Sequence, residues 1–374
     1  MANRKLETIS LAGYRSYNND FEQNKIDFHN INIIIGANGA GKSNLISFLE
    51  MVSYMMTRGL RGHVAKRGGT QPLLHFGAKR TEQLQGKLTV NDEDDEEYTY
   101  SFTLERAASD QLFFAREMLY YQKQQDKNRY RYDFGVGHNE AGIAESYETA
   151  SRSLRDYLAR LKVFHFNDTS INSHIRSNAN TTDSARLHSD GGNIAAFLYR
   201  MRTDPDEAPY YERIKKYIRM VLPQFYDFIL EPDENRGLAL NWQQAGSEEI
   251  FGPHQFSDGA LRFVALTTLL LQPPRTAPTT IILDEPEIGL HPMAISLLAK
   301  EIRMASKTSQ IIVSTQSPLL LDQFSCNDVI TADYDSARQC SVLRRHRESD
   351  LREWLKEYTL GELWEKNVLG GLPL

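Results

Sequence analysis

The stretch GANGAGKSNL, Gly36–Leu45, decides how the rest of this sequence is interpreted. It fits the pattern G-x-x-x-x-G-K-[ST], in which a glycine-rich loop joins a buried strand to a helix and holds phosphate groups. The apolar run Ile31–Ile35 predicts the strand, and the apolar spacing of Leu45–Val52 predicts the helix. Because both flanks are present, we reject a chance glycine turn and predict a phosphate-binding loop.

The residue types of this loop indicate what each position would do. Gly36, Gly39 and Gly41 let the backbone turn tightly and direct its N–H groups inward. Lys42 is predicted to reach the β- and γ-phosphates of a nucleotide, and Ser43 to bind Mg²⁺. The helix that starts near Lys42 would add its positive N-terminal dipole.

Composition places the chain among ordinary globular proteins. It has 374 residues, of which 41% are hydrophobic and 25% charged. The longest apolar candidate, Phe263–Leu271, is too short for the roughly 20 residues of a membrane helix. The start, Met1–Glu7, lacks the apolar core of a signal peptide. Two cysteines, Cys326 and Cys340, indicate neither a disulfide framework nor a thiolate zinc site. We therefore expect a cytoplasmic protein without a membrane partner.

The charge balance argues against a generally cationic surface for nucleic acid. Lys and Arg number 43 against 49 Asp and Glu, which gives a net charge of −6. A local basic groove stays open as an alternative. The densest basic stretch, Arg58–Arg67, is interpreted as a solvated loop surface. The acidic run Asp92–Glu97 lies between two alternating segments and predicts the exposed tip of a hairpin.

The pattern along the chain changes twice. The first part is strand-rich, with strands expected at Leu6–Leu11, Ile31–Ile35, Gln85–Val90, Tyr98–Leu104, Phe114–Tyr121 and Arg129–Phe134. A polar, helical part follows, with helices expected at Ser153–Leu161 and Ile194–Met201 around a loop, Asn167–Ser184, that we expect to be available to a partner. The third part alternates strand and helix, at Thr280–Leu283, Ala294–Ala305 and Gln310–Ser314.

An acidic strand end supplies the partner that a phosphate loop needs for its metal. In Thr280–Pro286, four apolar or β-branched residues precede two acids. Asp284 would hold Mg²⁺ through water, and Glu285 would orient or deprotonate the attacking water. The alternative interpretation is a capped strand end.

A serine–glycine turn lies upstream of that strand, at the mouth of an apolar helix. Ser257 and Gly259 offer a hydroxyl, a backbone N–H and a helix dipole to an anion. An ordinary N-cap is an equal alternative, with Ser257 or Asp258 capping Ala260–Leu271.

Together these motifs resemble the ABC-type ATPases, and more narrowly the branch that contains SMC and RecF proteins and the ATPases of OLD-type nucleases. The resemblance covers Leu6–Leu49 and Phe256–Phe324. Gly36–Leu45 is similar to the phosphate loop of this branch. The other matching segments are the signature-like Phe256–Gly259, the D-loop-like Glu287–Pro292, the switch-strand-like Ile312–Pro318, and Leu11–Tyr17, which is similar to the first strand of RecF-like heads.

The resemblance also implies roles for single residues. Those implied to bind the nucleotide, besides the loop glycines, Lys42 and Ser43, are Asn38, Asn44, Arg15, Ser257, Asp258 and Gly259. Those implied in catalysis are Lys42, Glu285 and Gln316. Two positions depart from the family pattern, since Gln316 replaces the usual histidine of the switch and Asp258 replaces the commoner glycine. Glutamine cannot take up a proton at neutral pH, so slow turnover is expected. Asn167 or Asp168 is a weak match for the glutamine that joins the two lobes.

The fold implied by the resemblance is an α/β ATPase head with a RecA-like core, an antiparallel β subdomain and a helical lobe. We expect an N-terminal ATPase lobe at 1–150, a helical insertion at 151–250, a C-terminal ATPase lobe at 251–345 and a tail at 346–374.

The implied activity is ATP hydrolysis with Mg²⁺ by a head-to-tail homodimer that sandwiches two nucleotides. Such an ATPase would act with DNA or with a separate effector, for example a Toprim-like nuclease, in repair or anti-phage defence. Fewer than about 60 residues follow the switch strand, against ~100 for a usual catalytic domain, so the effector is expected on another chain. A slow nucleotide-gated scaffold is the alternative, and a transporter subunit is disfavoured.

Overall fold

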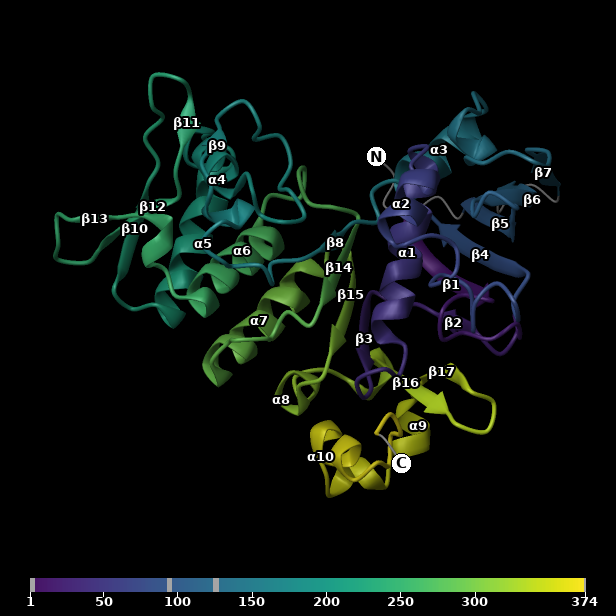
Figure 1. Cartoon of the computed structure of the whole chain (residues 1–374). Helices are drawn as coiled ribbons and strands as arrows, with labels where there is room; N and C mark the ends of the chain where they lie inside the picture. The colour runs from purple at the N-terminus through teal and green to yellow at the C-terminus, as the bar shows by residue number, and fades with distance from the viewer. Residues whose placement is uncertain (1–3, 93–95, 124–127, 373–374) are drawn as a thin grey trace.

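Two six-stranded sheets dominate the computed structural model, which describes residues 4–92, 96–123 and 128–372 (Figure 1). The central sheet has the order β17-β16-β3-β15-β14-β8. Its strands are β3 (Ile31–Ile35), β8 (Val163–Phe164), β14 (Thr280–Asp284), β15 (Gln310–Thr315), β16 (Val329–Asp335) and β17 (Cys340–Arg345). All neighbours run parallel except β17, which pairs antiparallel with β16. The carboxyl ends of β3, β14 and β15 therefore meet at one edge.

Both faces of the central sheet are buried, which explains the continuous apolar runs of its strands. Ile33 and Ile35 pack into one apolar cluster, whereas Ile34 packs into the other. Ile282 and Ile312 share the cluster of Ile34. This alternation follows from the two-residue period of side chains along a strand.

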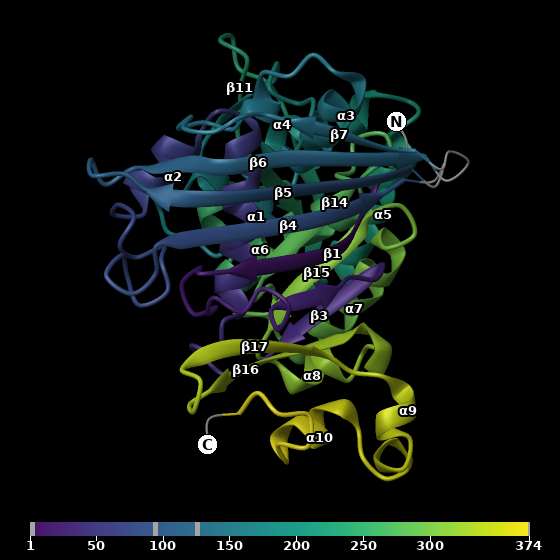
Figure 2. The same ribbon diagram turned by 90° about the vertical axis from the view of Figure 1, so that its right-hand side faces the viewer.

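The second sheet is antiparallel throughout and has the order β2-β1-β4-β5-β6-β7 (Figure 2). Its strands are β1 (Lys5–Ala12), β2 (Lys25–Asp27), β4 (Gln83–Asn91), β5 (Glu96–Arg106), β6 (Leu112–Lys123) and β7 (Arg129–Asp133). Each strand predicted for this part of the sequence is confirmed within three residues at either end. β4 and β5 form the expected hairpin, but residues 93–95 of its acidic tip lie outside the described residues.

A helix fills the space between the two sheets. This helix, α1 (Lys42–Met56), shares one apolar cluster with strands of both sheets. Its side chains in that cluster include Leu45, Phe48, Leu49 and Val52. α2 (Leu60–Lys66), η1 (Gly142–Ala144) and α3 (Thr149–Leu158) lie on the same side, and α3 begins four residues before the helix expected at Ser153.

The opposite face of the central sheet is covered by α6 (Asp258–Leu271) and α7 (Pro292–Ala305), and α5 (Ala208–Val221) packs on these two helices with α4 (Ile194–Thr203) beside it (Figure 1). Short strands accompany them, namely β9 (Ala179–Asn180), β10 (Phe225–Ile229), β11 (Gly237–Leu238), β12 (Asn241–Gln244) and β13 (Ile250–Phe251). The stretch expected to be helical therefore carries two small antiparallel sheets as well, β10-β12-β13 and β11-β9.

The loop Asn167–Ser184 is exposed at most of its positions, but part of it is buried. It contains the short helix η2 (His174–Arg176) and β9, and it buries Thr169, Ser173, Ile175, Arg176 and Ala179. The buried Arg176 has internal partners, because its guanidinium donates to the backbone carbonyls of Thr169 and Pro253. Availability of the loop to a partner stays a prediction.

The carboxyl-terminal part returns to the phosphate loop. Its helices are α8 (Pro318–Leu321), η4 (Cys326–Asp328), α9 (Glu348–Leu351), η5 (Trp354–Lys356) and α10 (Leu360–Glu365). After α10, the Gly371 carbonyl accepts a hydrogen bond of 2.5 Å from the Ala37 N–H. No local sequence pattern indicates this contact.

Candidate nucleotide site

The phosphate loop lies where the sequence predicted it, between the end of β3 and the start of α1. Gly36 has φ +151°, and a Cβ at this position would lie 2.2 Å from the Ala332 carbonyl oxygen. Only glycine fits there, because the backbone of β16 occupies the space of a side chain.

The loop leaves several backbone donors for an anion. Within the described part of the chain, no hydrogen bond is donated by the N–H groups of Asn38, Gly39, Gly41, Lys42 and Ser43. An ideal Cβ on Gly39 would contact nothing within 4 Å, so the tip of the loop is open. Unpaired N–H groups at a helix N-terminus form a phosphate site.

Lys42 is buried, and its ammonium group lies within the loop. Its Nζ donates to the carbonyl oxygens of Gly36 at 2.6 Å and Ala37 at 3.1 Å. Burial lowers the pKa of Lys42, and the carboxylates of Glu285 and Asp284 act in the opposite direction. The negative charge of the acidic strand end therefore acts on the Lys42 ammonium group.

The acidic strand end lies beside the switch strand at the same sheet edge. Asp284 of β14 pairs in register with Ser314 of β15, and the Ser314 hydroxyl donates to the Asp284 carboxylate. The Gln316 amide donates to the Glu285 carboxylate through Nε2. Glu285 adopts φ +49° and its N–H donates to the Ser314 carbonyl at 3.0 Å. The tertiary fold thus brings Lys42, Asp284, Glu285 and Gln316 together.

Glu287 also lies at this sheet edge, although the sequence indicates it only as part of the D-loop-like segment. It is buried, and its Oε1 accepts hydrogen bonds from the Thr315 hydroxyl and from the Gln316 N–H. Burial raises the pKa of the Glu287 carboxyl. The contact ties the D-loop to the backbone of the switch residue. An acid directly after Pro286 is the sequence signal that could have suggested it.

The signature-like turn is an N-cap, and the two N–H groups that follow it are unpaired among the described residues; anion binding at this turn stays a prediction. Ser257 caps α6 by accepting a hydrogen bond of 3.3 Å from the Ala260 N–H. Within the described residues, the N–H groups of Asp258 and Gly259 donate no hydrogen bond. A Cβ on Gly259 would lie 2.4 Å from the Gly289 carbonyl oxygen. The turn is therefore packed directly against the D-loop.

This turn opens a helix on the face of the central sheet opposite to the helix that follows the phosphate loop. The helix that it opens, α6, packs on one face of the central sheet, whereas α1, which follows the phosphate loop, packs on the other. Arg262 of α6 fixes the arrangement, since its guanidinium donates to the carbonyls of Ile288, Phe166 and Asn167. The role of Arg262 was missed by the sequence analysis.

The remaining predicted residues lie at the margin of the loop. Asn44 donates to the Ser16 hydroxyl at 2.7 Å, and Arg15 donates to the Asn44 side chain at 3.3 Å. Both therefore connect the loop that follows β1 to α1 in this conformation. Asn167 and Asp168 are exposed, and the Asp168 carboxylate accepts from the N–H and hydroxyl of Ser170.

The predicted magnesium ligands have suitable chemistry. Ser43 is exposed in the first turn of α1, and Asp284 is half-buried at the neighbouring strand end. A hydroxyl and a carboxylate are hard oxygen donors of the kind Mg²⁺ prefers alongside nucleotide phosphates. Elsewhere among the described residues, no group of three or more His, Cys, Asp or Glu side chains could hold a metal ion.

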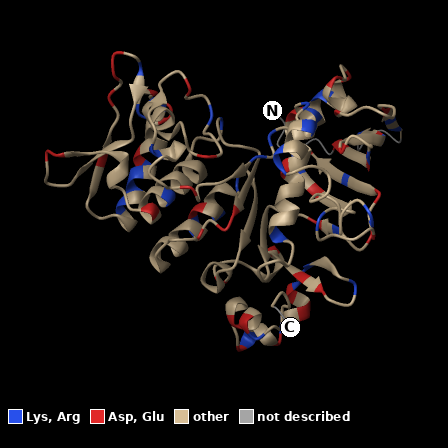
Figure 3. Ribbon diagram, in the orientation of Figure 1, with Lys and Arg blue, Asp and Glu red and all other residues tan. Residues whose placement is uncertain are grey.

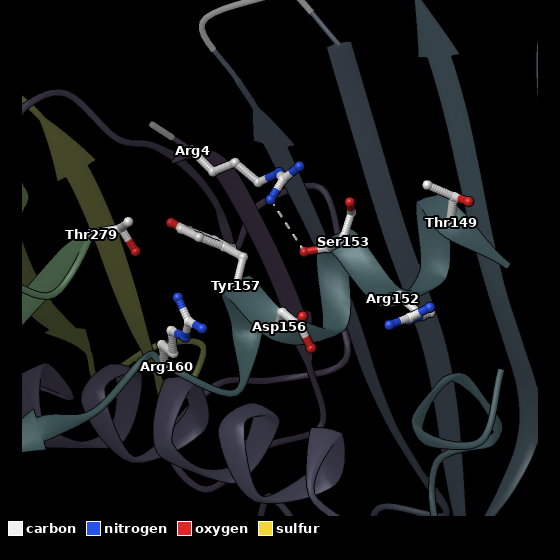
Figure 4. Close-up of a pocket in the computed structure, with 8 residues that line it drawn as sticks. All are labelled: Arg4, Thr149, Arg152, Ser153, Asp156, Tyr157, Arg160 and Thr279. Carbon is white, nitrogen blue, oxygen red and sulfur yellow. Dashed lines mark hydrogen bonds between the residues drawn. The ribbon is translucent and has the colours of Figure 1, made fainter. Parts of the chain in front are cut away.

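A basic hollow of about 340 Å³ lies near the start of β14, at the opposite end of that strand from Asp284 (Figure 4). It is lined by Arg4, Thr149, Arg152, Ser153, Asp156, Tyr157, Arg160 and Thr279. The Arg4 guanidinium donates to the Ser153 carbonyl at 3.4 Å. Because Thr279 precedes the amino end of β14, this hollow is separate from the nucleotide site.

The fold is similar to that of solved Smc head domains. The chain aligns with a structure titled "Crystal structure of the SmcHead bound to the C-winged helix domain of ScpA" with a TM-score of 0.59 and 17% identity, over 93% of this chain and 99% of that chain. It aligns with the Smc head domain with an extended coiled coil from Pyrococcus furiosus, bound to the C-terminal domain of ScpA, with a TM-score of 0.58 and 15% identity, over 95% and 99%. The chain therefore has the fold of an Smc head domain.

The chain belongs to the sequence family described as "AAA domain, putative AbiEii toxin, Type IV TA system", which matches residues 31–322. The matched segment runs from β3 through the phosphate loop and the acidic strand to α8. No curated protein gave a significant match. Over the described ranges, no helix is both long and apolar enough to cross a membrane.

Proposed function

We propose that the protein binds ATP with Mg²⁺ at this sheet edge and hydrolyses it. The observation that carries the proposal is the convergence of unpaired loop N–H groups, Lys42 and the acidic pair Asp284–Glu285 at the carboxyl ends of β3 and β14. Ligands of parallel α/β sheets bind at this end of the strands.

Each side chain then has a distinct task. Lys42 exchanges its loop carbonyls for oxygens of the β- and γ-phosphates, and Asp284 and Ser43 hold the metal that neutralises phosphate charge. Glu285 accepts the proton of the attacking water. Gln316 orients that water or the γ-phosphate by hydrogen bonding, without taking up a proton.

The proposed working unit is a head-to-tail homodimer. The signature turn opens on the face of the sheet opposite to α1, so its free N–H groups are directed to the nucleotide of a second copy. Exposed apolar side chains near the D-loop-like and switch-strand-like segments support this assembly. Ile288, Met293 and Leu319 are 45%, 54% and 36% exposed. Two-fold symmetry makes both sites equivalent.

ATP would control a separate effector or DNA. The family description names a toxin–antitoxin system, and the Smc heads of similar fold are bound to another protein, ScpA. Both facts support a separate protein partner. Figure 3 shows basic and acidic residues interspersed along the ribbon, which agrees with the net charge of −6 and favours a protein effector over extensive DNA contact.

A slow nucleotide-gated scaffold is the second candidate. The observation in its favour is the hydrogen bond from Gln316 to Glu285, because it engages the proposed base with an amide that cannot relay a proton. In that case the ATP-bound dimer is the signal and hydrolysis is only a reset.

One set of measurements tests both candidates. Multi-angle light scattering with Mg²⁺ and ATP, ADP or no nucleotide is expected to give a dimer only with ATP, because the γ-phosphate adds charge-assisted bonds across the interface. Steady-state phosphate release is then measured with and without DNA. A monomer under every condition contradicts the sandwich, and slow turnover that DNA leaves unchanged favours the scaffold.

A further inference from the structure

The carboxylate of Asp258 lies where the proposed function requires an anion to bind. Its side chain is 69% exposed in the first turn of α6, next to the unpaired N–H groups of the signature turn. A γ-phosphate that approaches this turn would meet a negative charge. Like charges at close range in a partly desolvated interface cost binding energy.

One arginine contacts both the charge and the backbone of the turn. Arg176 Nη2 donates to the Asp258 carboxylate at 2.8 Å, and its side chain is only 5% exposed. Its Nη1 donates at 2.5 Å to the carbonyl of Pro253, in the short helix η3 (Pro253–Gln255), and both terminal nitrogens lie 3.3 Å from the Phe256 carbonyl oxygen. Nε donates to the Thr169 carbonyl at 2.8 Å.

This geometry suits a guanidinium and no other side chain. A buried cation is tolerated only when its donors are paired, and here every nitrogen of Arg176 has a partner. Lysine offers one nitrogen and could not span three carbonyls and a carboxylate. Arg176 is 82 residues away from Asp258 in sequence, so only the fold brings the two together.

We propose that Arg176 is a positioning residue of the signature turn. It fixes the carbonyls that precede Ser257, and it neutralises Asp258 so that the turn can receive the γ-phosphate from a second copy of the chain. The inference rests on the proposed ATP-driven dimer. It also explains how this sequence accommodates an acid at a position where the family commonly has glycine.

The experiment compares Arg176→Gln with the double variant Arg176→Gln/Asp258→Asn. Glutamine keeps one amide donor for the carbonyls but removes the positive charge. Arg200→Gln is the matched control, because Arg200 also joins loop carbonyls, of Ser184 and Ala185, to a carboxylate, but lies away from the signature turn. All variants carry Glu285→Gln to prevent hydrolysis.

ATP-driven association is measured by sedimentation velocity, and the ATP affinity of the monomer by titration at low protein concentration. Arg176→Gln is expected to weaken association at least tenfold while monomer affinity changes less than twofold. The single variant Asp258→Asn is measured alongside. The association constant of the double variant is expected to lie within threefold of that of Asp258→Asn alone. Unchanged association in Arg176→Gln, or a loss that Asp258→Asn does not relieve, overturns the charge argument.

Hydrogen exchange in nucleotide-free protein tests the positioning without any dimer. Arg176→Gln should speed exchange at residues 253–260, whereas Arg200→Gln should speed it near residues 184–186 and 207 and leave 253–260 unchanged. Unchanged exchange at 253–260 overturns the positioning role. If the parent protein does not associate with ATP, the proposed dimer fails, and the exchange measurement still decides whether Arg176 orders the turn.

Discussion

Replacing Lys42 with alanine tests the nucleotide site most directly, and the structure sets the expected size of the effect. The ammonium already donates to the Gly36 and Ala37 carbonyls, so binding ATP exchanges two bonds instead of adding two. Hydrogen bonds that involve a charged group are worth about 1.5–3 kcal/mol each, and those between two charged groups are the stronger ones. If the two loop bonds that Lys42 gives up offset about half of the value of its two new bonds to phosphate, Lys42→Ala loses about 1.5–3 kcal/mol of ATP binding free energy. This corresponds to roughly 10- to 150-fold weaker ATP binding.

The assay is equilibrium titration with fluorescent ATP, ADP and AMP at fixed Mg²⁺. The loss should be largest for ATP, smaller for ADP and absent for AMP, because Lys42 addresses the β- and γ-phosphates. Lys300→Ala, at an exposed position of α7, is the control and should bind all three like the parent. A loss of ATP affinity below threefold refutes the reasoning. An equal loss for AMP would mean that the loop collapses without its lysine.

Three further predictions concern the catalytic acid, the signature turn and a buried carboxyl. Glu285→Gln should keep the ATP dimer in light scattering but release phosphate at least 100-fold more slowly, because an amide cannot accept the proton of water; rapid turnover would exclude Glu285 as the base. Ser257→Arg should bind ATP as a monomer yet fail to dimerise, owing to bulk and an unpaired charge at the interface; full ATPase activity would contradict the sandwich. Glu301 is fully buried beside Thr267, and burial raises its pKa from 4.5 to about 8. The Glu301 carboxyl ionises at lower pH in the unfolded chain than in the folded chain, so its burial costs no stability through ionisation below pH 4.5. As the pH rises from 4.5 toward 8, the free energy of unfolding falls by about 1.4 kcal/mol per pH unit. Glu301→Gln should therefore be more stable than the parent by about 3 kcal/mol at pH 7 and about equal near pH 4.5 in urea unfolding, and a difference independent of pH would refute this.

The local sequence determined the phosphate loop and most of the strands. A β-branched run, three glycines and the Lys42–Ser43 pair specify their own conformation, because φ preferences and the two-residue and 3.6-residue periods act within a few residues. The same holds for Thr280–Glu285, where a buried strand ends in two acids. The predicted strands accordingly agree with β3 fully and with β14 to within one residue, and the predicted helix pattern Leu45–Val52 lies inside α1.

Only the tertiary structure decided how these segments combine into a site. Glu287 bonds to Thr315 and Gln316, which lie 28 and 29 residues away in sequence. Arg176 bonds to Asp258, 82 residues away, and Ala37 bonds to Gly371 near the other end of the chain. Such pairings depend on parallel strand order and on which helix covers which face, and no local pattern encodes them. The loop Asn167–Ser184 shows the same reason at a smaller scale. Its polar composition predicts exposure, and most of its residues are exposed, but the fold buries Arg176 because it supplies backbone carbonyls as hydrogen-bond partners in place of water.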